Sequence, residues 1–230
     1  MKKSCAIYLL AISMVLAWGF LGLASGESEE TPNPAAVATI TIKNDVVINP
    51  ENTITVQWLT AYTKLDALGL KGFALGTDVI SSQLAHPENL QVKSYATYNL
   101  FGPFSLIAGA SVGDQGSYSL AGFWYYRDFG KFTFFADVRY YHDVGGSEDY
   151  SDVFLETIVP INKSWFWGAD VASNHWLFKN HDWILAGVLV GHKITNNLTV
   201  VGRGAPTWTM TDTSDHLGGE VRLEIRFDFF

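Results

Sequence analysis

The carboxyl-terminal stretch EVRLEIRFDFF, residues 220 to 230, alternates between apolar and charged side chains up to residue 229. In an extended strand, successive side chains point to opposite faces. One face therefore carries Val221, Leu223, Ile225, Phe227 and Phe229, and the other carries Glu220, Arg222, Glu224, Arg226 and Asp228. A strand of a soluble sheet turns its charged face to water, whereas a strand of a membrane barrel turns its apolar face to lipid. The rest of the chain decides between these two environments.

The first 26 residues, MKKSCAIYLLAISMVLAWGFLGLASG, have the composition of a secretory signal peptide. Lys2 and Lys3 precede a long apolar run, and small residues from Ala24 to Gly26 provide a cleavage site. An uncleaved inner-membrane anchor is the alternative for so long a run. Residues 27–36, ESEETPNPAA, are acidic and contain proline, which indicates a flexible leader. Export is therefore predicted, with one domain at 37–230.

Charge and cysteine content restrict the possible partners. Removal of residues 1–26 takes away Cys5, the one cysteine, so no disulfide is expected. It also takes away two lysines and no acid, so the formal net charge moves from −8 to −10. Nucleic acid is not an expected partner, because phosphate binding needs clustered Lys and Arg.

The composition is unusual for a soluble domain. Aromatic residues make up 14% and charged residues only 17% of the chain, where about a quarter charged is usual. Beyond the amino-terminal segment, no apolar run approaches the roughly 18 residues of a transmembrane helix. High apolar content divided into alternating segments is expected when only every second residue faces lipid.

Period-two alternation recurs along the chain and predicts about twelve strands, or ten as the alternative. The first predicted strand is residues 36–43 and the third is 67–76. The strand at 117–127 places Tyr118, Leu120, Trp124 and Tyr126 on the lipid side. Tight turns are expected at 102–103, 128–130, 162–164 and 195–197, with longer loops at 81–89, 142–151, 174–182 and 205–219. Short turns on one rim and longer loops on the other are typical of outer-membrane barrels. Aromatic residues cluster beside the tight turns, as expected for girdles at the membrane surface: Phe101, Phe104, Tyr126, Phe129, Phe132, Trp165 and Trp167.

On these features the sequence resembles a Gram-negative bacterial outer-membrane β-barrel protein of porin-like class. The resemblance implies an all-β fold, a transmembrane antiparallel up-and-down β-barrel in contact with outer-membrane lipid. It also implies that the barrel-assembly machinery recognises the carboxyl-terminal strand through an in-phase terminal aromatic, which here is Phe229, one residue before the end.

If the apolar faces contact lipid, the charged side chains point inward. The candidate pore-lining residues are Lys93, Asp137, Arg139, Glu156, Asp170, Arg203, Arg222, Glu224, Arg226 and Asp228, and the same alternation adds Lys71 and Arg127. Mixed charges can line a water-filled pore or close the interior with salt bridges. Arg203, Arg222 and Arg226 suggest a basic ladder for anionic solutes, although Glu224 and Asp228 are interleaved with it.

Catalytic and metal sites are not predicted. None of the six histidines is followed two positions later by the serine of a His-x-Ser pair. His142 with Asp143 and Ser147, and His175 with His181 and Asp182, match no strong motif. No cofactor fingerprint occurs. The predicted function is a passive porin or channel for small polar or charged solutes in the bacterial outer membrane. The alternatives are a closed structural or adhesive barrel, an outer-membrane lipid-modifying enzyme and a soluble β-sandwich.

Overall fold

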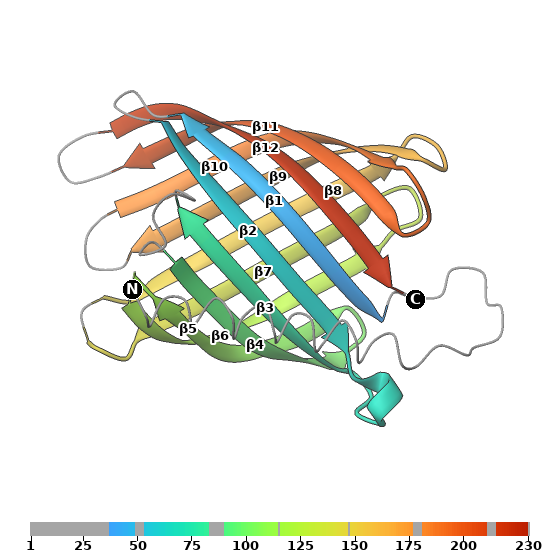
Figure 1. The fold of residues 1–230 in the computed structure, drawn as a ribbon, viewed down its shortest axis with the longest axis horizontal. Coiled ribbons are helices and arrows are strands. Elements are labelled where there is room, and N and C mark those ends of the chain that lie inside the picture. The colour runs from blue at the N-terminus through green and yellow to red at the C-terminus, as the bar shows by residue number, and fades with distance from the viewer. Residues whose placement is uncertain are drawn as a thin grey trace.

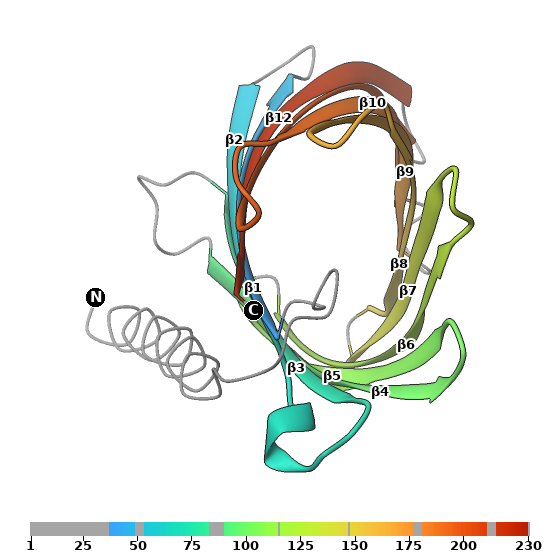
Figure 2. The same cartoon turned by 90° about the vertical axis from the view of Figure 1, so that its right-hand side faces the viewer.

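Twelve antiparallel strands form one closed up-and-down barrel in the computed structural model (Figures 1 and 2). The structure describes residues 37–48, 53–82, 90–114, 116–146, 148–176, 181–210 and 215–229. The predicted signal peptide and leader lie outside these ranges. The strands are β1 (Ala38–Ile48), β2 (Thr53–Lys64), β3 (Phe73–Ser82), β4 (Leu90–Phe101), β5 (Phe104–Gly113), β6 (Gly116–Asp128), β7 (Thr133–Asp143), β8 (Tyr150–Pro160), β9 (Trp165–Trp176), β10 (His181–Lys193), β11 (Leu198–Met210) and β12 (Asp215–Phe229). The predicted fold class and strand number are confirmed.

Closure of the barrel depends on the first and last strands. β1 pairs with β12 along its whole length, from Ala38 opposite Phe229 to Ile48 opposite Gly219. Pairing of this kind leaves no open sheet edge, and a wall in lipid needs this because lipid offers no hydrogen bonds to a free backbone. The described residues contain no helix that is long and apolar enough to cross a membrane.

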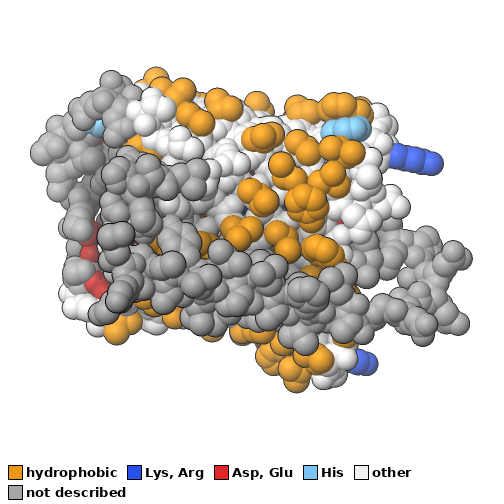
Figure 3. All heavy atoms as spheres, viewed as in Figure 1, with side chains coloured by type: hydrophobic (Ala, Val, Ile, Leu, Met, Phe, Trp, Pro, Cys, Tyr) orange, Lys and Arg blue, Asp and Glu red, His pale blue; other side chains and the backbone are white. Residues whose placement is uncertain are grey.

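The two faces of the wall differ in polarity as the alternation predicts. On β12, Val221 and Leu223 are 57% and 50% exposed, whereas Glu220 and Glu224 are 4% and 7% exposed. Hydrophobic side chains cover much of the outer wall in the view of Figure 3, and Lys and Arg appear at one end of the barrel. The apolar side chains of the wall therefore face outward and the charged ones face inward.

The strands extend further than predicted, so three of the predicted long loops are shorter than expected. β11 runs to Met210 and β12 begins at Asp215, so most of the predicted loop 205–219 is strand. The predicted loops 142–151 and 174–182 are likewise shortened from both sides by β7 to β10. Pro206 and the glycines suggested a loop, but Pro206 stands opposite Gly219 in the sheet register. The predicted contrast between short and long connections does not appear in the described part.

The connection between β2 and β3 also differs from the prediction. Residues Asp66–Leu68 form a short 3-10 helix, and β3 begins only at Phe73. The predicted strand at 67–76 is therefore wrong over its first half, and Lys71 lies exposed in the turn instead of facing the interior. This turn is on the rim where β1 begins and β12 ends, hereafter the terminal rim (Figure 1).

Candidate functional site: the charged barrel interior

All ten candidate pore-lining residues lie on inward-facing positions of their strands. They come from β4, β7, β8, β9, β11 and β12, and each is in phase with buried neighbours on its own strand or paired with inward residues of the next. The alternation of the sequence was sufficient to place them, because the side-chain period of a strand is two. Which of them meet across the interior depends on the closed barrel.

One group of charges, hereafter the Arg203 cluster, connects β1, β9, β11 and β12. Arg203 donates a hydrogen bond of 2.7 Å from Nη1 to Asp170 Oδ2 and another from Nη2 to Glu220 Oε1. Arg222 Nη2 lies 3.4 Å from the same Glu220 oxygen and donates at 2.8 Å to Asp45 Oδ2. Two guanidinium groups are thus held by three carboxylates inside the wall.

Nearer the terminal rim, β12 continues with a more accessible group. Arg226 Nη2 donates a 2.9 Å hydrogen bond to Glu224 Oε1, and Lys43 Nζ on β1 lies 3.7 Å from Glu224 Oε2. Asp228 accepts a 2.9 Å hydrogen bond from the Thr39 hydroxyl. The side chains of Lys43 and Arg226 are 27% and 39% exposed, so water reaches this part of the interior.

A second group, hereafter the Arg139 cluster, lies on β3, β4, β7 and β8. Arg139 donates to both oxygens of Asp137, at 2.9 Å from Nε and 2.7 Å from Nη2, and its Nη1 lies 3.4 Å from Asp78 Oδ2. Lys93 Nζ lies 3.3 Å from Asp152 Oδ2 and donates at 3.0 Å to the Tyr141 hydroxyl. Each basic group therefore has a carboxylate within salt-bridge distance.

Sequence reasoning missed several acidic partners in these clusters. Asp45 lies just beyond the predicted first strand, and Asp78 follows the predicted third strand, whose boundary was placed too early. Asp152 was at the edge of a predicted loop. Placing these strand ends correctly would have revealed all three, because each is in phase with the inward face.

An aromatic core packs beside the Arg139 cluster and overturns one prediction. Tyr118 and Leu120 are buried inside the barrel with Trp124 packed against them, so the predicted lipid-facing side of this segment is wrong. The core cluster consists of Tyr95, Ile107, Tyr118, Leu120, Tyr141 and Tyr150. Arg127, predicted to face inward, is in the opposite phase and exposed. Ser, Ala and Gly alternate with the aromatic residues on β6, and such small residues give no sign of which face is which.

Basic and aromatic side chains are in direct contact in this half of the barrel. The Arg139 guanidinium lies 4.5 Å from the centre of the Tyr95 ring, and Lys93 Nζ lies 4.5 Å from that of Tyr141. The Tyr95 ring also extends over β3, where a Cβ at Gly76 would come within 2.2 Å of it. The residue at position 76 must therefore be glycine for the ring to keep this place.

At the terminal rim the interior contains a cavity of about 450 Å³, which is lined by residues of β2 to β7 and their connecting turns. Tyr62, Trp124 and Phe135 line it together with polar groups such as Thr97 and Asn99. The Tyr62 and Trp124 ring centres are 5.5 Å apart, and the Trp124 and Phe135 ring centres are 6.0 Å apart. Aromatic side chains thus border this mouth of the barrel.

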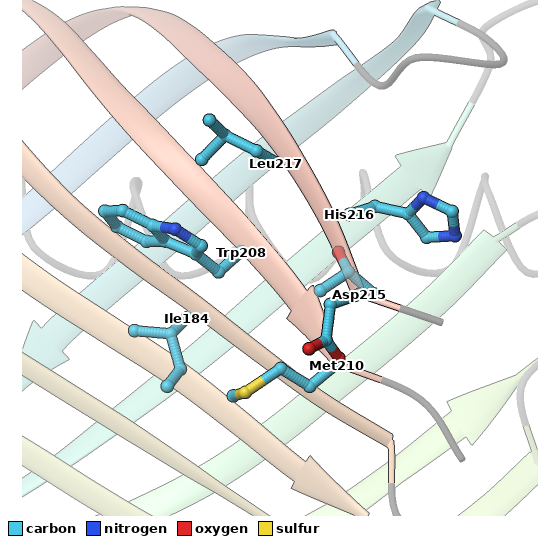
Figure 4. A pocket seen from close by; sticks show the side chains of 7 residues that line it. Ile184, Trp208, Met210, Asp215, His216 and Leu217 are labelled. Atoms are coloured by element: carbon cyan, nitrogen blue, oxygen red, sulfur yellow. The ribbon is translucent and has the colours of Figure 1, made fainter. Parts of the chain in front are cut away.

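A separate pocket of about 330 Å³ lies near the opposite rim, between β10, β11 and β12 (Figure 4). Ile184, Trp208 and Leu217 share one face of the sheet there, since Trp208 stands opposite both of the others in the register. That face is the outer one, in phase with the exposed Val188 and Val221. The apolar part of the pocket therefore belongs to the outer wall, and Thr209 and His216 of the inward phase line it at the rim.

The histidines form no recognisable catalytic or metal site in the described part. His142 Nδ1 lies 3.1 Å from Asp149 Oδ1, at the exposed end of the β7–β8 hairpin. Ser147, considered as its partner, lies outside the described residues, as do the side chains of His175, His181 and Asp182. No group of three His, Cys, Asp or Glu side chains among the residues described is arranged to hold a metal ion.

Comparison with known proteins supports the fold through structure alone. No protein-family model matches the chain, and no curated protein matches it in sequence. Among solved structures, the KdgM porin is similar at 12% identity and a TM-score of 0.59, covering 84% of this chain and 99% of that one. The NanC porin is similar at 10% identity and 0.57, covering 82% and 98%. The CymD monoaromatic hydrocarbon channel is similar at 9% identity and 0.51, covering 85% and 89%. At these identities the likeness is one of fold.

Proposed function

We propose that the protein is a bacterial outer-membrane barrel that acts as a passive channel for small polar or charged solutes. The observation that carries the proposal is the distribution of charge across a closed wall. Charged side chains of β12 lie inside while its apolar side chains are half exposed outside. Lipid is the environment in which such an outer face is stable, and a polar interior is the property that a pore requires.

The similar solved structures support the same function. KdgM and NanC are titled as porins and CymD as a channel, and one KdgM structure is titled as a complex with disordered oligogalacturonate. All three structures share the closed-barrel fold with this chain. None of these titles describes an enzyme, which agrees with our inference that this barrel is not catalytic.

A pathway through the interior would follow its more accessible charges. Lys43, Arg226 and Asp152 have side chains that are 27%, 39% and 30% exposed, whereas Arg203 and Asp170 are 3% and 2% exposed. The interior charges therefore divide into a water-accessible group, which includes Arg226, Lys43 and Asp152, and a packed group around Arg203. We propose that solutes pass the first group and that the second holds the wall together.

A closed structural barrel is the second candidate, and the packed interior favours it. Tyr141 is fully buried, and the Arg203 cluster leaves little water between its members. The channel and the closed barrel are distinguished by ion conduction, which only the channel should show.

Conductance in a planar lipid bilayer distinguishes them. We expect the refolded protein to insert and give discrete current steps, and the same protein denatured before addition to give none. Arg226→Ala should change the step size, because Arg226 borders the accessible interior. Its matched control is Lys131→Ala, in the exposed turn between β6 and β7, which should leave the step size unchanged. Insertion without steps would contradict the channel and favour the closed barrel.

Two further parts of the proposal concern delivery to the membrane. We propose that residues 1–26 are removed on export and that the assembly machinery binds β12, which ends at Phe229 on the outward-facing phase. Replacing Phe229 with serine should reduce the amount of assembled barrel in the outer membrane without lowering the amount exported. Equal assembly of both forms would contradict this role.

A further inference from the structure

We propose that the interior selects cationic and neutral solutes over anionic ones. This inference rests on the proposed channel function and specifies the solute class. It depends on how the charges of the described strands are paired, which the sequence did not reveal. In particular, the basic ladder suggested by Arg203, Arg222 and Arg226 is not available to an anion.

Every basic side chain that faces the interior between the rims, in the part of the chain described, already contacts a carboxylate. Arg203 and Arg139 each contact two carboxylates, as does Arg222. Arg226 and Lys43 share Glu224, and Lys93 contacts Asp152. An entering anion would have to compete with these fixed carboxylates for each guanidinium or ammonium group.

The carboxylates exceed the basic groups. Seven take part in these contacts with six basic side chains: Asp45, Asp78, Asp137, Asp152, Asp170, Glu220 and Glu224. Two more, Glu156 and Asp228, face the interior and make no salt bridge with a described residue. At the two rims, the inward-phase charges Lys64, Lys193, Asp128 and Asp143 balance one another. The described interior therefore carries an excess of negative charge.

Glu156 is one of the carboxylates responsible for this excess, and it lies near the water-accessible charges of the interior. It stands opposite Asp170 in the sheet register, and the charged groups that act on it are Arg226, Glu224, Lys43 and Asp170. Two of these are basic and two are acidic, so their charges cancel and leave that of Glu156 itself. A fixed charge beside a narrow aqueous path raises the local concentration of the opposite ion.

Reversal potentials in a KCl gradient across a planar bilayer test the inference. We expect the wild-type channel to pass K⁺ in preference to Cl⁻. Glu156→Gln should lower the K⁺/Cl⁻ permeability ratio about two- to sixfold, because a unit charge about 8 Å from the path, screened by salt to some extent, changes the local concentrations of K⁺ and Cl⁻ in opposite directions. The variant breaks no salt bridge to a described residue, so its fold should be retained. Glu156→Gln combined with Asp228→Asn should lower the ratio further.

Asp215→Asn is the matched control, because it removes one negative charge from the outward phase of β12. It should leave the ratio unchanged. Galactosamine, galactose and galacturonate, which share a ring size but differ in charge, should enter protein-containing vesicles in that order of rate. A channel that conducts but prefers Cl⁻, or whose ratio is insensitive to Glu156→Gln, overturns the inference and leaves the channel intact. Absence of any conductance overturns both.

Discussion

Arg203 on β11 holds one carboxylate from β9 and one from β12, and all three side chains are almost fully buried. Removing one member of a buried ionic group leaves the others charged without compensation, which costs far more than the net stabilisation by the group. Arg226, four residues after Arg222 on β12, remains 39% exposed and keeps water as an alternative partner. Burial, rather than charge, therefore separates structural from accessible arginines here.

Replacing Arg203 with methionine should lower the free energy of unfolding by about 3–5 kcal/mol, because Asp170 and Glu220 would stay buried without their partner. The measurement is a urea titration of the barrel in detergent micelles or vesicles. Arg226→Met is the matched control, with an expected loss of about 1 kcal/mol or less. Similar losses in the two variants would contradict the assignment of Arg203 to the packed group.

At the scale of single elements, β12 combines the two environments of the wall. Its odd-numbered side chains from Val221 to Phe229 face outward, and its even-numbered ones from Glu220 to Asp228 face inward. A one-residue shift of register would exchange all of them, so the alternation also specifies the register. The sequence of β12 and its contact with lipid therefore together determine which of its side chains face outward and which face the interior.

Leu223→Arg should lower the free energy of unfolding by about 2–4 kcal/mol if Leu223 lies near the middle of the bilayer. The reason is the transfer of a guanidinium group into hydrocarbon. Val144→Arg provides the comparison, because Val144 is exposed in the turn after β7 and should tolerate the charge. Urea titration in vesicles measures both. A Leu223→Arg barrel as stable as the wild type would show that water, not lipid, lies against this face.

The end of the β7–β8 hairpin is held by hydrogen bonds to the Asp149 carboxylate, which protonation of Asp149 should weaken. Hydrogen bonds from the Tyr140 hydroxyl, from the backbone N–H of Asp143 and from His142 lower the pKa of Asp149 below its ordinary value of 3.8. A carboxyl whose pKa is lower in the folded state stabilises that state above the ordinary value, and this contribution is lost as the pH falls through the lowered one. The hairpin end should therefore loosen only in acid below pH 3.8.

Hydrogen exchange of the amides at 144–149, followed over a pH series, measures this loosening after correction for intrinsic rates. Asp149→Asn should give a hairpin end that is already loosened at neutral pH and that has lost the acid-dependent step. If the acid-dependent increase in exchange were equally large in Asp149→Asn, a group other than Asp149 would be responsible for it.

For the whole molecule, the decisive feature is closure between β1 and β12. A closed sheet has no edge from which unfolding can begin, so detergent alone should leave it folded. We expect the unboiled protein to migrate differently from the boiled protein on a detergent gel. A variant lacking residues 38–48 should lose this difference, because its two edges would be unpaired. Identical migration of boiled and unboiled wild type would contradict a closed barrel.

The sequence by itself determined the strands, their number and most of their faces. The reason is that a two-residue period is local: Leu223 and Arg222 need no distant partner to show which face each occupies. It failed where the local signal was ambiguous. Pro206 and Gly219 resembled loop residues although they extend β11 and β12. Tyr118 and Leu120 resembled lipid-facing residues because their neighbours on β6 are small.

Only the tertiary structure decided which charges meet. Asp45 and Arg222 are 177 residues apart in the chain and become partners through the pairing of the first and last strands. Closure supplies Asp45 to Arg222, while Asp170 and Glu220 hold Arg203 and Glu224 holds Arg226. The three arginines of β11 and β12 are therefore neutralised and form no anion ladder, and Glu156 has no salt bridge to any described residue. Alternation fixes the direction of a side chain, but electrostatic energy depends on distances across the barrel, and these exist only once the sheet has closed.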